Sequence, residues 1–245
     1  MISPATNENQ KHGRRGRPAR SQATLQDMRR SVVEAGVEAL SEHGYVAAGL
    51  DGLLRRTSIP KGSFYSLFPS KEAFGLSVLS AYSTYFDRKL DRHLLSDERR
   101  PLERLAAFVE DAKAGMTRHD FRRGCVVGNL GQDIQSLPSS FRDALRNVLA
   151  GWEDRVAACL RDAQQAGETS RDADPAEQAR VFWIGWEGAV LRARLERSTA
   201  PLDCFARHFL VAVAASSTKT GVGNVQGNLD REDGRRDRCE AGRSG

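Results

Sequence analysis

The chain has 245 residues, of which 40% are hydrophobic and 28% charged, and this composition excludes collagen-like, mucin-like and fully disordered proteins. It contains no uninterrupted run of about 18 apolar residues, so we expect no membrane span. The first twenty residues have no apolar stretch after their basic residues, which argues against a secretory signal. We therefore expect a cytoplasmic protein.

The net charge of +5 is concentrated at the ends of the chain. The first twenty residues carry one acidic side chain and five basic ones, Lys11, Arg14, Arg15, Arg17 and Arg20. The last thirty residues carry six basic and five acidic side chains, and the segment between sums to zero. A short basic arm on a neutral body favours contact with a polyanion, although composition alone fits a solvated, disordered leader about equally well.

Between residues 22 and 215 almost every segment shows the apolar spacing of three and four residues that predicts helix. The first helix runs to about His43 and ends at Gly44. Two short helices follow, and Ser70 is placed to cap a long helix that reaches about Leu95. The predicted helices are 22–43, 50–57, 61–68, 70–95, 101–118, 125–136, 139–166, 174–197 and 202–215. The fold class is therefore all-α, followed by a tail that is poor in apolar residues and expected to be disordered.

The helices predicted at 50–57 and 61–68 are joined by a short turn, which is typical of a helix-turn-helix whose second helix enters the major groove of DNA. Phe64 and Phe68 of the second helix would pack inward. The residues left to face the groove are small, basic or hydroxyl-bearing: Lys61, Gly62, Ser63 and Tyr65. Since many helical hairpins bind nothing, the pattern alone only suggests DNA binding.

The segment IPKGSFYSLFPSKEAF, residues 59–74, resembles the DNA-binding signature of the TetR/AcrR family of transcriptional regulators. The resemblance covers about residues 22–75. It implies that Lys61, Ser63 and Tyr65 contact operator bases or backbone and that Lys71 contacts a phosphate. The implied domains are a basic arm (1–20), a three-helix helix-turn-helix DNA-binding domain (21–70), a helical effector-binding and dimerisation domain (71–215) and the disordered tail (216–245).

Two positions depart from the family pattern. Ser58 stands where a turn glycine is usual, which suggests a slightly different turn, and Leu67 stands where His or Tyr is common, which removes one DNA contact. The basic arm resembles arms that place arginine in a narrow minor groove, here Arg15 and Arg17. Phosphate neutralisation alone would also explain its charge.

The segment FWIGWEGAVLRARLE, residues 182–196, places Trp183 and Trp186 near one face beside the small residues Gly185 and Gly188. Large aromatic residues next to small ones suit an interface between helices, and a core helix within one chain fits almost as well. We expect a homodimer, because one short recognition helix contacts few bases whereas a twofold pair binds a palindrome.

Cys125 follows Arg122, Arg123 and Gly124 at the predicted start of a helix. Helix N-terminal amides and two guanidinium groups would favour a thiolate, which makes Cys125 the best candidate for a reactive residue. A buried cysteine that packs as a small apolar residue is equally consistent with this segment.

The segments FRRGC (121–125) and WIGWEGA (183–189) resemble the acrylate-utilisation branch of the family and its electrophile-responsive relatives, which sense through a thiol at this place. The resemblance implies acrylate or a related unsaturated acid as effector. The implied effector-binding residues are Arg122, Arg123, Cys125, Trp183, Trp186 and Glu187. The alternative is a repressor of an efflux pump that senses a bulky apolar drug. A small polar pocket would favour the first hypothesis and a large aromatic cavity the second.

The four cysteines are far apart in sequence and the histidines are scattered, so neither a metal site nor a cofactor is expected. An enzyme would have to use Cys125 with His119 as its base, without a third group or a glycine-rich phosphate loop. We therefore do not expect an enzyme. The expected partners are double-stranded DNA carrying a palindromic operator, a small effector and a second copy of the chain, with no membrane contact.

Overall fold

The computed structural model describes residues 21–215, and the predictions made for the basic arm, including Arg15 and Arg17, and for the tail lie outside the described residues. Within 21–215 the chain is helical and contains no strand, which confirms the all-α prediction. The helices are α1 (Gln22–Ala47), α2 (Leu50–Thr57), α3 (Lys61–Leu67), α4 (Lys71–Leu94), α5 (Pro101–Arg118), α6 (Val126–Gln132), a 3₁₀ turn (Ile134–Ser136), α7 (Ser140–Gln165), α8 (Pro175–Glu196) and α9 (Ala200–Ala215).

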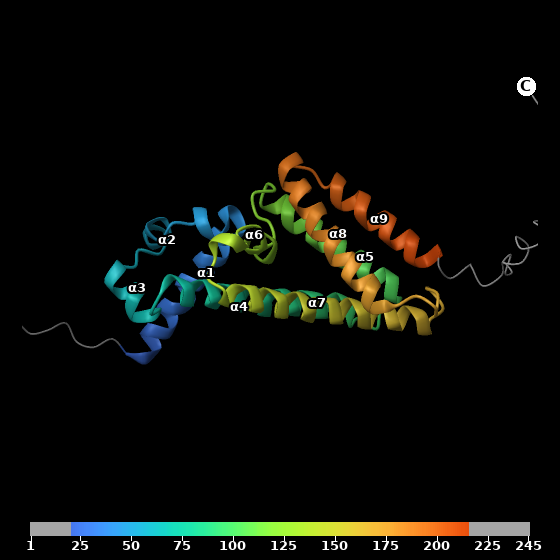
Figure 1. Ribbon diagram of the computed structural model, residues 1–245, viewed down its shortest axis with the longest axis horizontal. Coiled ribbons are helices and arrows are strands. Elements are labelled where there is room, and N and C mark those ends of the chain that lie inside the picture. Colours follow the sequence, from blue (N-terminus) through green and yellow to red (C-terminus); the bar gives the residue numbers. More distant parts are fainter. Residues whose placement is uncertain (1–20, 216–245) are drawn as a thin grey trace, which may run out of the picture.

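The molecule is elongated, with α1, α2 and α3 at one end and α8 and α9 towards the other (Figure 1). The long helix α4 leaves the first end and runs beside α7, and α5 and α8 pack across this pair. The short helix α6 lies between the two ends and packs against α1. Any signal between the ends can therefore pass through α4 or through α6.

Side-chain caps and a left-handed glycine fix the main helix boundaries. Ser21 and Ser70 accept the amides of residues three positions later, at 3.2 and 3.0 Å. Asp174 accepts the amide of Ala176 at 2.9 Å, directly before the proline that begins α8. Gly44 has φ 73°, a backbone conformation that residues with a Cβ rarely adopt. It interrupts α1 at the position where the sequence predicted the end of this helix. The predicted cap at Ser70 is confirmed.

The helix predicted over 125–136 is wrong in its extent. The structure has α6 followed by a separate 3₁₀ turn, and Cys125 is the residue that precedes α6 rather than part of its first turn. The break falls at Asp133, whose carboxylate accepts the amides of Tyr45 and Val46 at 2.8 and 3.3 Å. This long-range bond to the end of α1 ends α6 early, and the local sequence pattern could not reveal it.

Two aromatic clusters form the core. Beside α3, Phe64, Phe68 and Phe74 pack with ring centroids 5.2–5.4 Å apart. Phe64 and Phe68 are fully buried, as predicted. In the body of the molecule, Trp152 lies 4.4 Å from Phe86 and 5.0 Å from the Trp183 ring. These contacts join α4, α7 and α8 into one core.

The interpretation of the α8 tryptophans as interface residues is corrected by this packing. Trp183 and Trp186 are both buried within the chain. Gly185 serves the same core, because a side chain there would collide with Phe205 of α9. Gly188 differs, since it is exposed and a Cβ added to it would meet no atom within 4 Å. Of these four residues, only Gly188 is therefore free to meet another molecule.

Candidate nucleic-acid interface and effector cavity

Helix α3 presents a solvent-exposed surface on a rigid base. Its Phe64 is fully buried while the neighbouring Tyr65 is 50% exposed, because adjacent helical positions point about 100° apart. Lys61 is exposed and its Nζ lies 3.8 Å from Asp51 Oδ1 of α2. A Cβ added to Gly62 would meet no atom within 4 Å, so another backbone can approach this position closely. Of the α3 residues that the sequence assigned to DNA contact, Lys61, Gly62 and Tyr65 are thus exposed, whereas Ser63 is half-buried.

Lys71 is held differently. Its Nζ lies 4.3 Å from the centre of the Tyr45 ring and donates a hydrogen bond to the Tyr45 carbonyl at 3.3 Å. This half-buried ammonium links the start of α4 to the end of α1. Its contact with a phosphate stays a prediction, and such a contact would compete with the bond to Tyr45.

The turn between α2 and α3 is built on Ser58 in the left-handed region, with φ 53° and ψ 26°. A glycine adopts this conformation without the Cβ clash that costs other residues about 1–2 kcal/mol. The turn is therefore the one a glycine would make. Ser58 adopts this conformation at the cost of backbone strain, and the slightly different turn expected from the family departure stays a prediction.

A cavity of about 1310 Å³ is lined by the helices α1, α4, α5 and α8 and by the loop that precedes α6. Tyr82, Phe86, Cys125, Trp186 and Val190 contribute to its apolar wall. Its basic lining residues outnumber its three carboxylates, and they are Arg29, Arg30, Lys89, Arg92, Arg118 and Arg123. The combination of an apolar wall and a basic lining suits a ligand with an apolar part and a negative charge.

Cys125 is buried in the cavity wall, where it lies within hydrogen-bonding reach of the Tyr82 hydroxyl and the Glu187 carboxyl. Burial and the neighbouring Glu187 raise the pKa of the Cys125 thiol well above its usual range, and the amide of Gly128 opposes this rise only in part. The prediction that the arginines and the helix amides favour a thiolate is therefore wrong. At neutral pH Cys125 is a thiol.

The two arginines do not contact this thiol. Arg122 is exposed and offers its backbone carbonyl to Arg194. Arg123 lines the same cavity as Cys125, but its guanidinium pairs with Glu38 and Glu42, each at 3.2 Å. Of the six predicted effector residues, the structure places Arg123, Cys125 and Trp186 in the cavity lining.

Of the other three, Arg122 is exposed, and Trp183 and Glu187 lie behind that wall. Trp183 is buried in the aromatic core, and Glu187 reaches Cys125 from α8. Burial raises the pKa of Glu187 from 4.5 to about 7. His119, the base considered for an enzyme, does not affect the pKa of Cys125. The pKa of His119 itself is lowered by burial and by Arg123 and Arg118.

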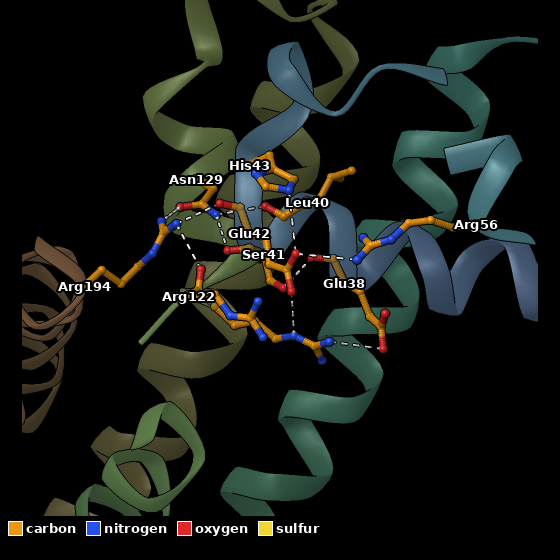
Figure 2. A network of polar contacts seen from close by, with 10 residues as sticks. Glu38, Leu40, Ser41, Glu42, His43, Arg56, Arg122, Asn129 and Arg194 are labelled. Carbon is orange, nitrogen blue, oxygen red and sulfur yellow. Dashed lines mark hydrogen bonds and ion pairs between the residues drawn. The ribbon is translucent and has the colours of Figure 1, made fainter. Parts of the chain in front are cut away.

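A polar network, which we call the α6 network, joins α6 and α8 to the end of α1 (Figure 2). The Asn129 amide donates to the carbonyls of Leu40 and Ser41 at 2.8 and 3.0 Å. Arg194 of α8 donates to Asn129 Oδ1 at 3.1 Å and to the Glu42 carbonyl at 2.8 Å. Because these groups are buried or partly buried, each carbonyl depends on its partner.

Beside it, the carboxylate of Glu42 lies 3.2 Å from Arg123, 3.8 Å from Arg56 and 3.6 Å from His43. Figure 2 shows the contacts of Glu42 with Arg56 and His43. Arg56 belongs to α2, the first helix of the helix-turn-helix, whereas Arg123 lines the cavity. Glu42 therefore connects the cavity and the helix-turn-helix through side chains alone.

The residues of these sites that were not predicted from the sequence include Tyr82, Asn129, Asp133 and Arg194. A signal existed for Asn129, which interrupts the apolar run from Val126 to Leu130 and is therefore a polar residue at a core position. Nothing in the local pattern marked the others, because their partners are more than 40 residues away.

An exposed second helix after a tight turn, set on a helical body with a large cavity, is typical of helix-turn-helix regulators. Comparison with known proteins agrees. Residues 32–77 match the model of bacterial regulatory proteins of the tetR family, and residues 101–209 match the tetracyclin repressor-like C-terminal domain. This chain belongs to the TetR family of transcriptional regulators, which are DNA-binding proteins rather than enzymes.

Among its relatives, the transcriptional regulator AcuR of Cereibacter sphaeroides is 50% identical over 196 residues, which is 80% of this chain and 89% of AcuR. A solved structure of a regulatory protein TetR from Rhodobacter sphaeroides has a TM-score of 0.73 at 50% identity and covers 74% of this chain and 96% of that one. The reduced form of Escherichia coli NemR has a TM-score of 0.67 at 28% identity, covering 75% and 95%. These relatives support a transcriptional repressor.

Two further properties concern residues 21–215. No helix in this range is long and apolar enough to cross a membrane. Nor does the range contain a group of three or more His, Cys, Asp or Glu residues arranged to hold a metal ion.

Proposed function

We propose that this protein is a homodimeric repressor that holds a palindromic operator through α3 and releases it when acrylate or a related unsaturated electrophile binds beside Cys125. The observation that carries the proposal is the position of Cys125 in the wall of a cavity whose neighbouring helix, α6, is hydrogen-bonded to the end of α1. A change at the thiol is thereby adjacent to the helix that leads into the helix-turn-helix.

The DNA part of the proposal is supported by the exposed surface of α3. Lys61 and Tyr65 are exposed, although the Tyr65 ring also packs edge-to-face against Phe64, and the start of α3 is open around Gly62. A recognition helix of this length contacts few base pairs, so a second copy is needed for useful specificity.

The dimer is supported by an apolar stripe along α8. Val181, Ile184, Leu191 and Leu195 are 52%, 70%, 48% and 81% exposed, and Gly188 lies between them. Their spacing of three and four residues puts them on one helix face. Exposed apolar side chains in such a row are typical of a surface that a second copy covers.

The dimer can be tested at Leu195, the most exposed residue of the stripe. Leu195→Glu should give monomers in analytical ultracentrifugation at micromolar concentration, because two buried charges would meet across a twofold axis. Leu95→Glu, a change at a residue that is 66% exposed and off the stripe, is the matched control and should remain dimeric. A dimeric Leu195→Glu variant, or a monomeric wild type, would contradict the proposed interface.

The effector is supported by the chemistry of the Cys125 site and by the 50% identity to AcuR. A soft thiol beside a carboxyl group and a phenolic hydroxyl suits a compound that accepts sulfur at an activated double bond. The basic lining of the cavity, Arg118 and Arg123 included, suits the carboxylate of an unsaturated acid.

The size of the cavity favours a second candidate function. A volume of about 1310 Å³ exceeds that of a typical drug pocket and far exceeds what acrylate fills, so a bulky apolar ligand also fits. In that case Tyr85, Phe86 and Trp186 would form the binding wall, and Cys125 would only pack against the ligand.

The two candidates separate in an operator-release experiment. Fluorescence anisotropy with DNA from upstream of the protein's own gene should show an affinity loss of about a hundredfold with acrylate or N-ethylmaleimide, which corresponds to about 2.7 kcal/mol of coupling. Cys125→Ser should bind the operator normally and lose the response to N-ethylmaleimide. The matched control Cys204→Ser, a change at an exposed thiol on α9, should respond as the wild type does. If neither compound weakens binding, the drug-sensing function is favoured instead.

A further inference from the structure

Three titratable groups lie together at the cavity wall. Cys125 lies directly before α6, and its sulfur is within hydrogen-bonding reach of Tyr82 from α4 and Glu187 from α8. Cys125 and Tyr82 line the cavity, and Glu187 stands behind the sulfur. Gly128 makes this arrangement possible, because any side chain there would collide with Glu187 Oε2. The fold therefore keeps a carboxyl group against the thiol.

Glu187 is an unusual carboxyl group. Its Oε1 is buried and has no hydrogen-bond partner among the described residues, and no ion pair is formed with it in residues 21–215. Arg123, which precedes Cys125 by two positions, is engaged by Glu38 and Glu42 instead. A buried carboxyl without a cation is destabilising, so a group kept this way is a candidate for chemistry.

The protonation of this pair suits proton transfer. Burial raises the pKa of Glu187 to about 7, so the carboxyl is divided between its two forms at neutral pH. Burial and Glu187 together raise the pKa of Cys125 and keep it as a thiol. A thiol of this kind needs a base during attack, and a base whose pKa is near the working pH is the most effective one. Tyr82, whose own pKa is raised far by burial, remains a hydrogen-bond donor.

We infer that Glu187 accepts the proton of Cys125 and so turns the buried thiol into a nucleophile toward α,β-unsaturated carbonyl compounds that enter the cavity. The inference rests on the proposed function and names the residue that activates its sensor. Glu187 acts through Cys125 and is thus a positioning and proton-accepting residue rather than one that touches the ligand.

The step balances without an oxidant or reductant. The sulfur–hydrogen bond breaks as its proton passes to the Glu187 carboxylate, and the sulfur forms a bond to the β-carbon. The π electrons of the double bond move to the α-carbon and the carbonyl, and the α-carbon then takes a proton from solvent. Glu187 returns its proton to solvent, so the thiol has added across the double bond. Tyr82 donates a hydrogen bond to the sulfur as its negative charge develops.

The test measures how fast Cys125 is alkylated. The full-length protein is treated with N-ethylmaleimide between pH 5.5 and 9, and peptide mass mapping follows the adduct on each cysteine. In the wild type the rate at Cys125 should rise with an inflection near pH 7, because that is where Glu187 becomes a base. Glu187→Gln should lower the rate at pH 7 by about a hundredfold and remove this inflection, leaving a rise only at higher pH.

Controls separate this effect from loss of structure. Glu177→Gln makes the same charge change at an exposed position of the same helix and should alkylate as the wild type does. Cys204, which is exposed, should react at the same rate in all three proteins. Operator binding and circular dichroism should show that Glu187→Gln remains folded.

Two outcomes would overturn the inference. One is a Glu187→Gln variant that alkylates Cys125 at the wild-type rate with the wild-type pH profile. The other is a wild type in which N-ethylmaleimide never modifies Cys125. Neither outcome removes the proposed function, because release of the operator by non-covalent binding would still be seen in the anisotropy experiment. If alkylation of Cys125 follows the expected profile but leaves operator binding unchanged, the proposed function fails while the Glu187 assignment stands.

Discussion

The α3 surface and the Cys125 site differ in the exposure of their polar side chains. On α3, Lys61 and Tyr65 stand in solvent above a base of packed phenylalanines. At the cavity wall Cys125 and Tyr82 are buried, Glu187 reaches the sulfur from α8, and the pKa of each group is affected by one or both of the others. The first site presents exposed groups on a rigid helix, and the second contains ionisable groups whose titrations are coupled.

Because of this difference, substitutions on the exposed surface of α3 should affect mainly function, whereas substitutions at the Cys125 site should affect stability and function together. On α3, Lys61 can change without loss of a contact to Phe64, and Tyr65 touches that ring only with its half-exposed side chain. At the Cys125 site, any change in Glu187 alters both the folding free energy and the reactivity of the thiol, because burial of the carboxyl contributes to both. The following predictions test this separation in order of expected effect.

The base of α3 should be the most sensitive position. Phe64 is fully buried against Phe68 and Phe74, so Phe64→Ala should lower the free energy of unfolding by about 3–5 kcal/mol. Urea unfolding followed by circular dichroism at fixed protein concentration measures the loss. The adjacent Tyr65→Ala removes a half-exposed ring and is the control, which should lose far less. Equal losses would show that α3 does not rest on a separate aromatic base.

Glu187 should make stability depend on pH. Its folded-state pKa of about 7 lies above the ordinary value of 4.5, so the folded state binds the proton more tightly than the unfolded state does. The resulting stability is present below about pH 4.5 and is lost as the pH rises to about 7. The separation corresponds to about 3 kcal/mol.

The measurement compares wild type with Glu187→Gln at pH 5 and pH 8. The variant stays neutral at both values, so its advantage over the wild type should grow by up to about 3 kcal/mol between them. Glu177→Gln should show no such growth. If the wild type and Glu187→Gln keep the same stability difference at both pH values, the carboxyl is ionised throughout and the coupled site described above is wrong.

The exposed groups of α3 should affect binding alone. Lys61→Ala and Tyr65→Ala should each weaken operator binding by about 1–3 kcal/mol, and the Lys61 variant should also show a reduced dependence on salt. Titrations at several salt concentrations measure both effects. Arg171→Ala removes an exposed cation from the loop between α7 and α8 and should bind as the wild type does. Wild-type affinity in both α3 variants would exclude this surface as the DNA contact.

The smallest effect is expected in the turn before α3. Ser58 has φ 53°, so Ser58→Gly should relieve backbone strain and raise the free energy of unfolding by about 0.5–1 kcal/mol. Ser58→Ala keeps the Cβ and should bring no such gain. Thermal unfolding of the two variants measures the difference, and a gain in the alanine variant would point to the serine hydroxyl rather than to the backbone.

Much of the fold could be predicted because its signals are local. The caps at Ser21, Ser70 and Asp174 act within three residues, and the inward face of α3 follows from helical spacing. The extent of α6 could not be predicted in this way. Asp133 ends it by bonding to Tyr45 and Val46, which are almost 90 residues away in the chain.

The candidate sites divide along the same line. Sequence alone determined that the chain is helical, that 50–68 forms a helix-turn-helix, and that Lys61, Gly62 and Tyr65 of its second helix are exposed. Ser63, which the sequence assigned to the same surface, is half-buried. Only the tertiary structure decided the state of Cys125. The nearby arginines in sequence point elsewhere, while Glu187 from α8 and Tyr82 from α4 surround the sulfur. The reason is physical: exposure follows from helical periodicity, whereas a buried pKa depends on which distant groups share the same desolvated space.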